Sequence, residues 1–327
     1  MESIILKNFA KPTKEGKYYL NWSNCRNFIS KEWDKLSKLE NSVIRFDLEG
    51  FDFINLDGLI WLLLIGEILH NNNYLILNLP RDKQLLKYMK SVGFHQIAAE
   101  IFDIYPKFYI EEVEEYKLSK GIRIEKVSSV NLQNVQKNFH RFIESKDFYK
   151  MLNIAYTGQI SWEYIPYLVL IISELLSNIV EHSGKTLNTG EGYAGMFVSG
   201  QKINIIVADA GVGFTKGLKR KEIIVKSSEE AIKKAFLFRY YKNKTKVEGK
   251  GIFEALKCIR KLGGSVRIGS ENAEGNLSMK GRLYEEKNED EKLKQIIEKE
   301  LKSYSRRYFP GVQYSILLDL PERRNCS

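Results

Sequence analysis

The hydrophobic pattern in the second half of the chain predicts a long helix with one apolar and one polar side. In and just before the stretch Ser173–Gly184, apolar residues recur every three or four positions, at Leu168, Ile171, Ile172, Leu175, Leu176 and Ile179. An adjoining strip carries polar side chains, at Glu174, Asn178, Glu181 and His182. Pro166 suits the first turn of this helix, and Gly184 suits its end. We therefore expect one side to be packed in a core and the other to be available for chemistry.

A strand that ends in a carboxylate is predicted next along the chain. The run Ile203–Phe214 is apolar and β-branched, and it ends in Asp209, Gly211 and Gly213. Glycines in this spacing allow a ligand to approach the backbone closely. The pattern predicts that Asp209 is delivered into a pocket.

A glycine pair before an amphipathic helix forms the third predicted element. In Glu248–Gly264, Gly249 and Gly251 directly precede apolar residues at helical spacing. The free amides and the positive dipole end of a helix N-terminus attract phosphate. This segment is therefore interpreted as a phosphate-binding helix start.

Alternating strands and helices are predicted in the first part of the chain. Two apolar runs have strand character, and an apolar helix and a shorter helix follow them in turn; the expected order is Ser42–Leu48, Asp57–His70, Asn73–Leu79 and Lys83–Ser91. This alternation indicates an α/β layer structure. The polar run Glu111–Lys120 is the predicted linker.

The hydrophobic pattern also predicts further helices and strands after the linker. Helical spacing is expected over Asn131–Ile143, and a segment able to close over a ligand over Thr215–Val247. Strands are expected over Ser265–Ser270 and Gly311–Leu318. Between them, Lys280–Tyr308 is dense in charge and predicts an added amphipathic helix, with apolar residues at Leu293, Ile296, Ile297 and Leu301.

Composition favours a two-domain protein without a membrane span. The chain has 327 residues, 43% of them hydrophobic and 28% charged, which is enough to bury two cores. Its cysteines, Cys25, Cys258 and Cys326, have no metal-ligand spacing and suit a reducing cytoplasm. The longest apolar run, Leu59–Leu69, is short and contains Glu67, and the first residues lack a signal-peptide pattern. We expect a cytoplasmic protein that makes no membrane contact.

Charge is unevenly distributed between the two parts. Residues 1–120 hold 16 Lys/Arg and 17 Asp/Glu, whereas residues 121–327 hold 35 and 24, a net charge of +11. A triphosphate ligand would use a few of these cations, and a solvated basic face accounts for the others. Contact with nucleic acid stays open, although no motif supports it.

The three segments, in this order, resemble the N-box and the two glycine boxes of the GHKL superfamily of ATPases, which includes gyrase, heat-shock ATPases and bacterial sensor kinases. The resemblance covers roughly Gly121–Pro321. It implies a two-layer α/β sandwich domain that binds ATP and Mg²⁺. We therefore expect an ATP-binding domain over residues 121–327, with a charged helical insertion at about 280–308.

The resemblance also implies roles for single residues. Glu174 matches the position that orients or deprotonates the attacking group, and Asn178 matches the Mg²⁺ ligand. Asp209 matches the acceptor for the adenine amino group, with Gly211 and Gly213 making room for the base. The phosphates would be covered by a loop with nearby cations; its residues are Gly249 and Gly251, with Lys244, Lys246 and Lys250. Val312 stands where the family has a threonine, which places that contact to Asp209 in question.

The first part of the chain resembles the STAS fold of anti-sigma-factor antagonists. The match spans roughly residues 40–102, and the expected domain is 1–115. At the position of the family's phosphorylatable serine, this chain has Leu56 next to Asp57. Asp57 is expected either to act as a fixed negative charge or to cap the following helix. The domain is therefore expected to dock a partner or to dimerise.

Two outputs remain open for the ATP-binding part. One is phosphoryl transfer to a serine or threonine of a protein partner, as the resemblance to bacterial anti-sigma-factor kinases implies. The other is a nucleotide-driven switch with slow hydrolysis, in which two subunits or a partner dock when ATP binds. A protein partner is expected in both, and a homodimer is compatible with either.

Overall fold

Two units divide the chain, and each is built on its own sheet. The computed structural model describes residues 2–106, 121–151, 161–183, 191–199, 202–240, 251–279 and 288–319. Unit 1 comprises Met1–Leu118 and Ile122–Lys126, and unit 2 comprises Ser119–Gly121 and Val127–Ser327. The division runs through strand β7 (Gly121–Val127). The predicted linker, Glu111–Lys120, lies wholly outside the described residues.

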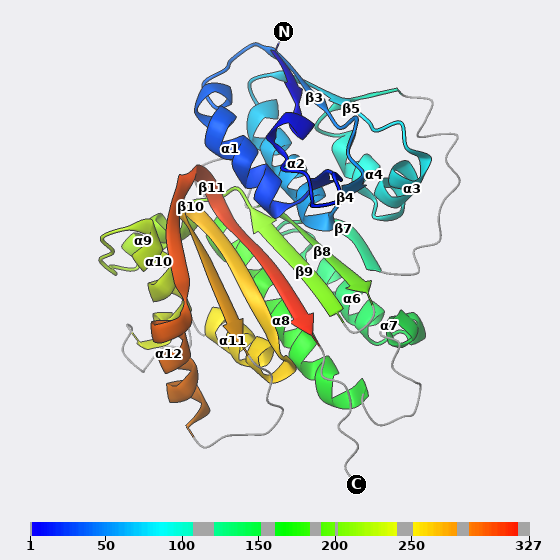
Figure 1. The fold of residues 1–327 in the computed structure, drawn as a ribbon. Helices are drawn as coiled ribbons and strands as arrows, with labels where there is room; N and C mark the ends of the chain where they lie inside the picture. Colours follow the sequence, from blue (N-terminus) through cyan, green and yellow to red (C-terminus); the bar gives the residue numbers. More distant parts are fainter. Residues whose placement is uncertain are drawn as a thin grey trace. The chain divides into compact units, whose positions relative to one another are not determined.

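Unit 1 contains a four-stranded parallel sheet with helices (Figure 1). Its strand order is β1-β3-β5-β6, with bounds Glu2–Ile5, Val43–Asp47, Tyr74–Asn78 and Asp103–Tyr105. A short parallel pair joins β2 (Tyr19–Leu20) to β4 (Phe53–Ile54). The helices are η1 (Leu6–Phe9), α1 (Trp22–Leu36), α2 (Leu56–His70), α3 (Lys83–Ser91) and α4 (Phe94–Ala98). The predicted strand and helix order is confirmed, and β1 and α1 are additions to it.

Helix α2 forms the centre of unit 1. Its residues from Leu56 to Gly66 are all buried, which explains why the sequence shows an apolar run rather than an amphipathic stripe. Trp61 of α2 meets Trp22 of α1 edge to face, with ring centroids 5.4 Å apart. The run from Leu59 to Leu69 is therefore a core helix of this unit.

Asp57 has a different role from the expected helix cap. It is the second residue of α2, while Asn55 precedes the helix as its N-cap residue. Its Oδ2 accepts a hydrogen bond of 3.0 Å from the backbone N–H of Trp22, and its Oδ1 accepts one of 2.9 Å from Gly58. Because Trp22 opens α1, the buried carboxylate joins the N-termini of two helices, whose dipoles favour a negative charge. The expectation of a simple N-cap was wrong.

Unit 2 is built on a second, largely antiparallel sheet. The strand order is β10-β11-β9-β8-β7, and the pairs β10–β11, β9–β11 and β8–β9 are antiparallel. The bounds of β8 to β11 are Gly192–Ser199, Lys202–Asp209, Gly264–Met279 and Lys302–Asp319. The helices are α6 (Leu132–Ile143), α7 (Lys146–Met151), α8 (Ser161–Ser183), α9 (Gly213–Arg220), α10 (Ser228–Phe236), η2 (Phe238–Tyr240), α11 (Gly251–Leu262) and α12 (Glu289–Glu300). The expected sheet-and-helix architecture is confirmed.

Helices α8 and α11 pack together on one face of this sheet (Figure 1). A Cβ added to Gly192 of β8 would lie 2.9 Å from the Ile179 side chain of α8. A Cβ added to Gly264 of β10 would lie 3.3 Å from the Ile259 side chain of α11. The two glycines therefore let both helices approach the strands closely. This contact sets the height of α8 above the strand that ends in Asp209.

The C-terminal strands are longer than the sequence suggested. Strand β10 continues from the predicted end at Ser270 to Met279, and β11 begins at Lys302 rather than at Gly311. Residues 302–305 pair with β10 at residues 273–276. The expected charged helix is confirmed over α12, where Leu293 and Ile297 are buried, but residues 302–308 are strand. Their alternating serines and tyrosines favour a strand over the helix that charge density indicated.

Gly311→Ala should lower the free energy of unfolding by more than about 1 kcal/mol. Gly311 has a φ of 80°, and an added Cβ would overlap the backbone carbonyl of Asp209. Gly217→Ala in α9 is the matched control, because no atom lies within 4 Å of its Cβ position. Alanine should stabilise that helix by about 0.5–1 kcal/mol. Denaturant titration compares the variants, and equal unfolding midpoints would contradict this account.

Candidate functional site

Helix α8 separates an apolar side from a polar strip, as predicted. All six residues of the apolar stripe are buried: Leu168, Ile171, Ile172, Leu175, Leu176 and Ile179. Glu174 and Asn178 are half-buried, and Glu181 is exposed. Pro166 lies inside the helix, which begins at Ser161, so the expected start was about one turn late. The side chain of His182 lies outside the described residues.

By length and composition alone, the same helix is long and apolar enough to cross a membrane, over Tyr164–Glu181. The core helix of a globular domain can have the same length and composition, and the buried stripe of α8 packs against the strands of unit 2. The expectation from the sequence considered only the longest apolar run, Leu59–Leu69, and did not consider the longer helix α8.

Glu174 and Gly251 come together although 77 residues separate them in sequence. Gly251 is the first residue of α11, and a Cβ at this position would overlap Oε2 of Glu174. Any larger side chain at 251 would displace the carboxylate. The first and third predicted segments thus meet at a single contact between α8 and the start of α11.

The surroundings of Glu174 make its carboxyl group a weaker acid than usual. Partial burial raises its pKa, and the negative charges of Glu181 and Glu254 raise it further. A raised pKa brings a carboxylate nearer to the range in which it exchanges protons at neutral pH. The group is therefore suited to accept a proton.

The side-chain amide of Asn178 has a hydrogen-bond donor that no group in the described part of the chain pairs with. Its Nδ2 atom is buried and has no hydrogen-bond partner there. A buried amide without a partner is costly, and a ligand oxygen would satisfy it. The unpartnered atom is a donor and suits a phosphate oxygen, while the metal role would fall to the amide oxygen. Among the described residues, no cluster of three His, Cys, Asp or Glu side chains forms a metal site.

Asp209 lies at the end of β9 as predicted, and it is buried with 6% of its surface exposed. Burial raises the pKa of this carboxyl group to about 7, although hydrogen bonds from the backbone of Gly211 and Val312 oppose the shift. The Gly211 N–H donates to Oδ1 at 2.7 Å. The carboxylate is thus held by backbone amides and keeps capacity to accept a hydrogen bond from a ligand.

Val312, which stands where the resemblance would place a threonine, contacts Asp209 through its backbone. Val312 lacks a hydroxyl, but its N–H bonds the Asp209 carboxylate. Sequence reasoning missed Gln313, which is fully buried and whose Nε2 donates to the Asp209 carbonyl at 3.3 Å. A polar residue in a strand that is otherwise apolar around it was the only available signal.

Gly213 is the first residue of α9, and the backbone conformation at this position favours glycine. Its φ is 73°, and an added Cβ would lie 2.5 Å from Cγ of Glu271. Ser270 and Glu271 accept hydrogen bonds from the N–H groups of Phe214 and Thr215, at 2.9 and 2.8 Å. These β10 side chains already occupy the amides at the start of α9. Gly213 therefore serves this packing, and its expected role beside a bound base stays a prediction.

The described residues also bring the first predicted segment close to the second. Gly192 pairs with Asp209 in the β8–β9 register, and Gly192 also contacts Ile179, the residue after Asn178. Helix α8 therefore passes close to the end of β9 at Ile179, one residue after Asn178. Gly249 and Lys250 lie outside the described residues, as do Lys244 and Lys246.

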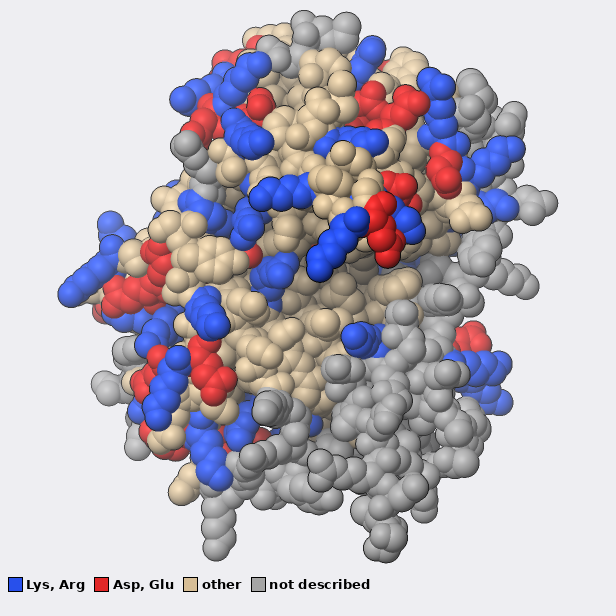
Figure 2. Space-filling model, viewed as in Figure 1, with Lys and Arg blue, Asp and Glu red and all other residues tan. Residues whose placement is uncertain are grey.

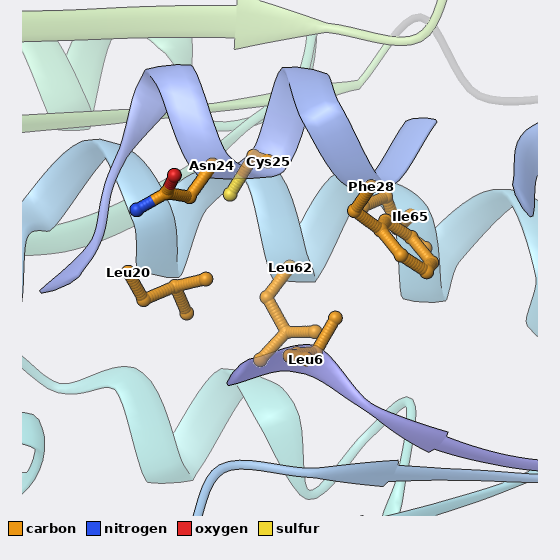
Figure 3. Close-up of a pocket in the computed structure, with 7 residues that line it drawn as sticks. All are labelled: Leu6, Leu20, Asn24, Cys25, Phe28, Leu62 and Ile65. Carbon is orange, nitrogen blue, oxygen red and sulfur yellow. The ribbon is translucent and has the colours of Figure 1, made fainter. Parts of the chain in front are cut away.

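A small cavity lies elsewhere, in unit 1 (Figure 3). Its volume is about 10 Å³, and seven residues line it: Leu6, Leu20, Asn24, Cys25, Phe28, Leu62 and Ile65. This is about the space of one water molecule. The Asn24 amide already bonds the Tyr19 carbonyl and the Lys11 N–H. The cavity is a packing gap and not a ligand site.

No known protein-family model matches the sequence, and comparison with curated proteins and with solved structures found no match. The likeness to the GHKL and STAS families consequently rests on the motifs themselves. The positions of Glu174, Gly251 and Asp209 in the structure support the site independently of this likeness.

Asp209→Asn should stabilise the protein in a pH-dependent way. The folded-state pKa is about 7 against 3.8 for the free group, so the folded chain holds the proton more tightly and wild-type stability falls as pH rises through this window. Asparagine has no such proton. Between pH 4 and 7 the free energy of unfolding of the variant should increase relative to that of wild type. The increase should reach up to about 4 kcal/mol, because each unit of pKa difference corresponds to about 1.4 kcal/mol. Denaturant titrations across this range test it.

Asp147→Asn, at an exposed carboxylate of α7, is the control for the change in net charge. A stability difference between Asp209→Asn and wild type that does not change with pH would show that burial does not perturb this carboxyl group.

Proposed function

We propose that this chain is a Mg²⁺–ATP-binding regulatory protein that resembles anti-sigma-factor serine/threonine kinases and acts on a protein partner in the cytoplasm. The observation that carries the proposal is the contact between Glu174 and Gly251. It joins a candidate proton acceptor to the start of a helix that suits phosphate. The buried carboxylate of Asp209 supports the same proposal.

Adenine recognition falls to Asp209 in this proposal. A buried carboxylate discriminates strongly among ligands, because a ligand without a donor leaves it unsatisfied. The adenine amino group is such a donor. Gly211 and Gly213 would leave space beside the base.

The phosphates would lie between α8 and the start of α11. Asn178 would present its amide oxygen to Mg²⁺ and its unpartnered Nδ2 to a phosphate oxygen. Mg²⁺ supplies charge neutralisation on the phosphates when it is bound. Gly249, Lys250 and Gly251 would cover the phosphates, with the N-terminal amides of α11 directed at them.

Glu174 is the proposed catalytic residue. Its carboxylate would take the proton of an attacking hydroxyl or water. The attack forms a phosphorus–oxygen bond at the γ-phosphate and breaks the bond to the β–γ bridging oxygen, which leaves with ADP. The raised pKa of Glu174 suits this proton transfer.

The two outputs differ in the acceptor of the phosphoryl group. A kinase transfers it to a serine or threonine of the partner, whereas an ATP-driven switch transfers it to water and changes how subunits or a partner dock. Incubation of the full chain with γ-labelled ATP and purified candidate partners separates them. Label on protein indicates a kinase, and free phosphate alone indicates a switch.

Asp209→Asn should weaken ATP binding by about 1.5–3 kcal/mol, the range for a hydrogen bond to a charged group. The measurement is calorimetry at pH 8, above the pKa of about 7, where the wild-type carboxylate is ionised. The variant should be at least as stable as wild type at this pH, so unfolding cannot explain lost affinity. Undiminished affinity would remove the adenine assignment, and wild-type protein that binds no ATP would refute the proposed function.

Glu174→Gln should retain ATP affinity and lose turnover by roughly 10²–10⁴-fold, as expected for removal of a general base. Glutamine preserves the packing against Gly251. Asp147→Asn, at an exposed carboxylate of α7, is the control and should keep its turnover. Affinity and phosphate release are measured on the same preparations. Parallel loss of both in Glu174→Gln would assign the residue a structural role.

A further inference from the structure

An exposed apolar residue stands in a basic segment that is formed by the second half of α9 and by the turn leading to α10. We call this segment, residues Lys216–Lys226, the basic loop. It contains five Lys/Arg and one Glu, a net charge of +4. Ile224 within it is 82% exposed, and among the large apolar side chains of the described residues only Val130 is more exposed. In Figure 2 basic side chains protrude at the left margin, beside acidic ones, where Figure 1 shows α9 and α10.

The loop is held in place by specific hydrogen bonds. The Lys234 ammonium of α10 donates to the Ile224 carbonyl at 2.5 Å, and the Lys226 N–H donates to the Glu230 carboxylate at 2.6 Å. The Ile223 N–H donates to the Leu218 carbonyl at 3.0 Å, where the chain turns back from α9. These bonds fix the backbone on both sides of Ile224. The isoleucine is therefore presented in one position, which lowers the entropic cost of binding.

The positive charge of the loop is largely uncompensated. Four of its cations are exposed and form no ion pair within the described residues: Lys216, Lys219, Arg220 and Lys226. The neighbouring acid Glu230 is paired with Lys234 at 2.9 Å, and Glu229 bonds the Ser305 hydroxyl. A surface of this sign attracts an acidic partner and speeds its association.

We propose that the basic loop is a docking surface for an acidic protein segment that has an apolar pocket for Ile224. A single apolar anchor surrounded by charges matches the arrangement of a protein interface, in which a central contact is ringed by polar residues. The loop has no aromatic side chain to stack on a base, which disfavours single-stranded nucleic acid. It also lacks the Trp, Phe or Leu residues that anchor segments in a membrane interface, beyond the buried Leu218.

None of the residues of this surface belongs to the candidate site, although they lie within Thr215–Val247, the segment that the sequence predicts to close over a ligand. The test uses the full chain in its source cells, with the photo-crosslinking residue benzoylphenylalanine at position 224 or, as control, at position 130. Val130 is 94% exposed but lies in a turn without a basic cluster. Position 224 should give a discrete protein adduct that position 130 does not give. Absence of such an adduct, or adducts of lipid or nucleic acid, would overturn the proposal.

The adduct protein, purified, is then titrated against the unmodified chain and three variants. Ile224→Asp should weaken binding at least tenfold, and so should Lys219→Glu combined with Arg220→Glu. Val130→Asp should bind as wild type. All variants should keep wild-type thermal unfolding and ATP affinity, which separates this surface from the nucleotide site. Equal affinity in Ile224→Asp and Val130→Asp would overturn the proposal.

Discussion

Burial of the apolar stripe of α8 against the strands of unit 2 positions the candidate site. Six aliphatic side chains on one side of the helix leave it a single rotational setting, because any other would expose them to water. That setting directs Glu174 toward Gly251 and carries Asn178 past the end of β9. The polar strip is thus located by residues that take no part in its chemistry. A site carried on a packed helix is held more rigidly than a site on a loop.

The buried carboxylate of Asp209 opposes stability in the same region. A carboxylate in apolar surroundings is costly, and amide donors from Gly211 and Val312 offset only part of the cost, which is why its pKa rises to about 7. A neutral residue at this position would be the more stable choice. A group that destabilises the fold suits ligand recognition better than structural support, and so does the buried, unpartnered Nδ2 of Asn178 in the same unit.

The spacing of apolar residues predicted the helices and strands that bury one side or all sides in a core. It failed where contacts with distant parts of the chain determine the local structure. The stripe of α8, the strand β9 and the helix α3 follow from residue spacing alone. Residues 302–308 were expected to be helical because of their charge, but pairing with β10 makes them strand. Asp57 was expected to cap its own helix, and its bond to Trp22 depends on α1, which is 35 residues away. Similarly, no local pattern indicates that Gln313 and Glu271 support Asp209 and α9.

The long β10–β11 extension connects these parts of unit 2. Arg306 of the extension donates to the Gln313 side chain at 2.8 Å and to the Glu271 carbonyl at 3.2 Å. Gln313 reaches the Asp209 carbonyl, and Glu271 holds the start of α9.

Helix α12, between the two strands, extends the same frame toward α11. Lys257 of α11 pairs with Asp290 at 2.9 Å, and Lys261 pairs with Glu289 at 3.5 Å. Such partly exposed pairs contribute little energy each, so the buried Leu293 and Ile297 supply most of the attachment. The β10–β11 extension and α12 therefore connect the end of β9, the start of α9 and α11 to one another. A ligand that moved any one of them would have to move, or break, contacts to the other two.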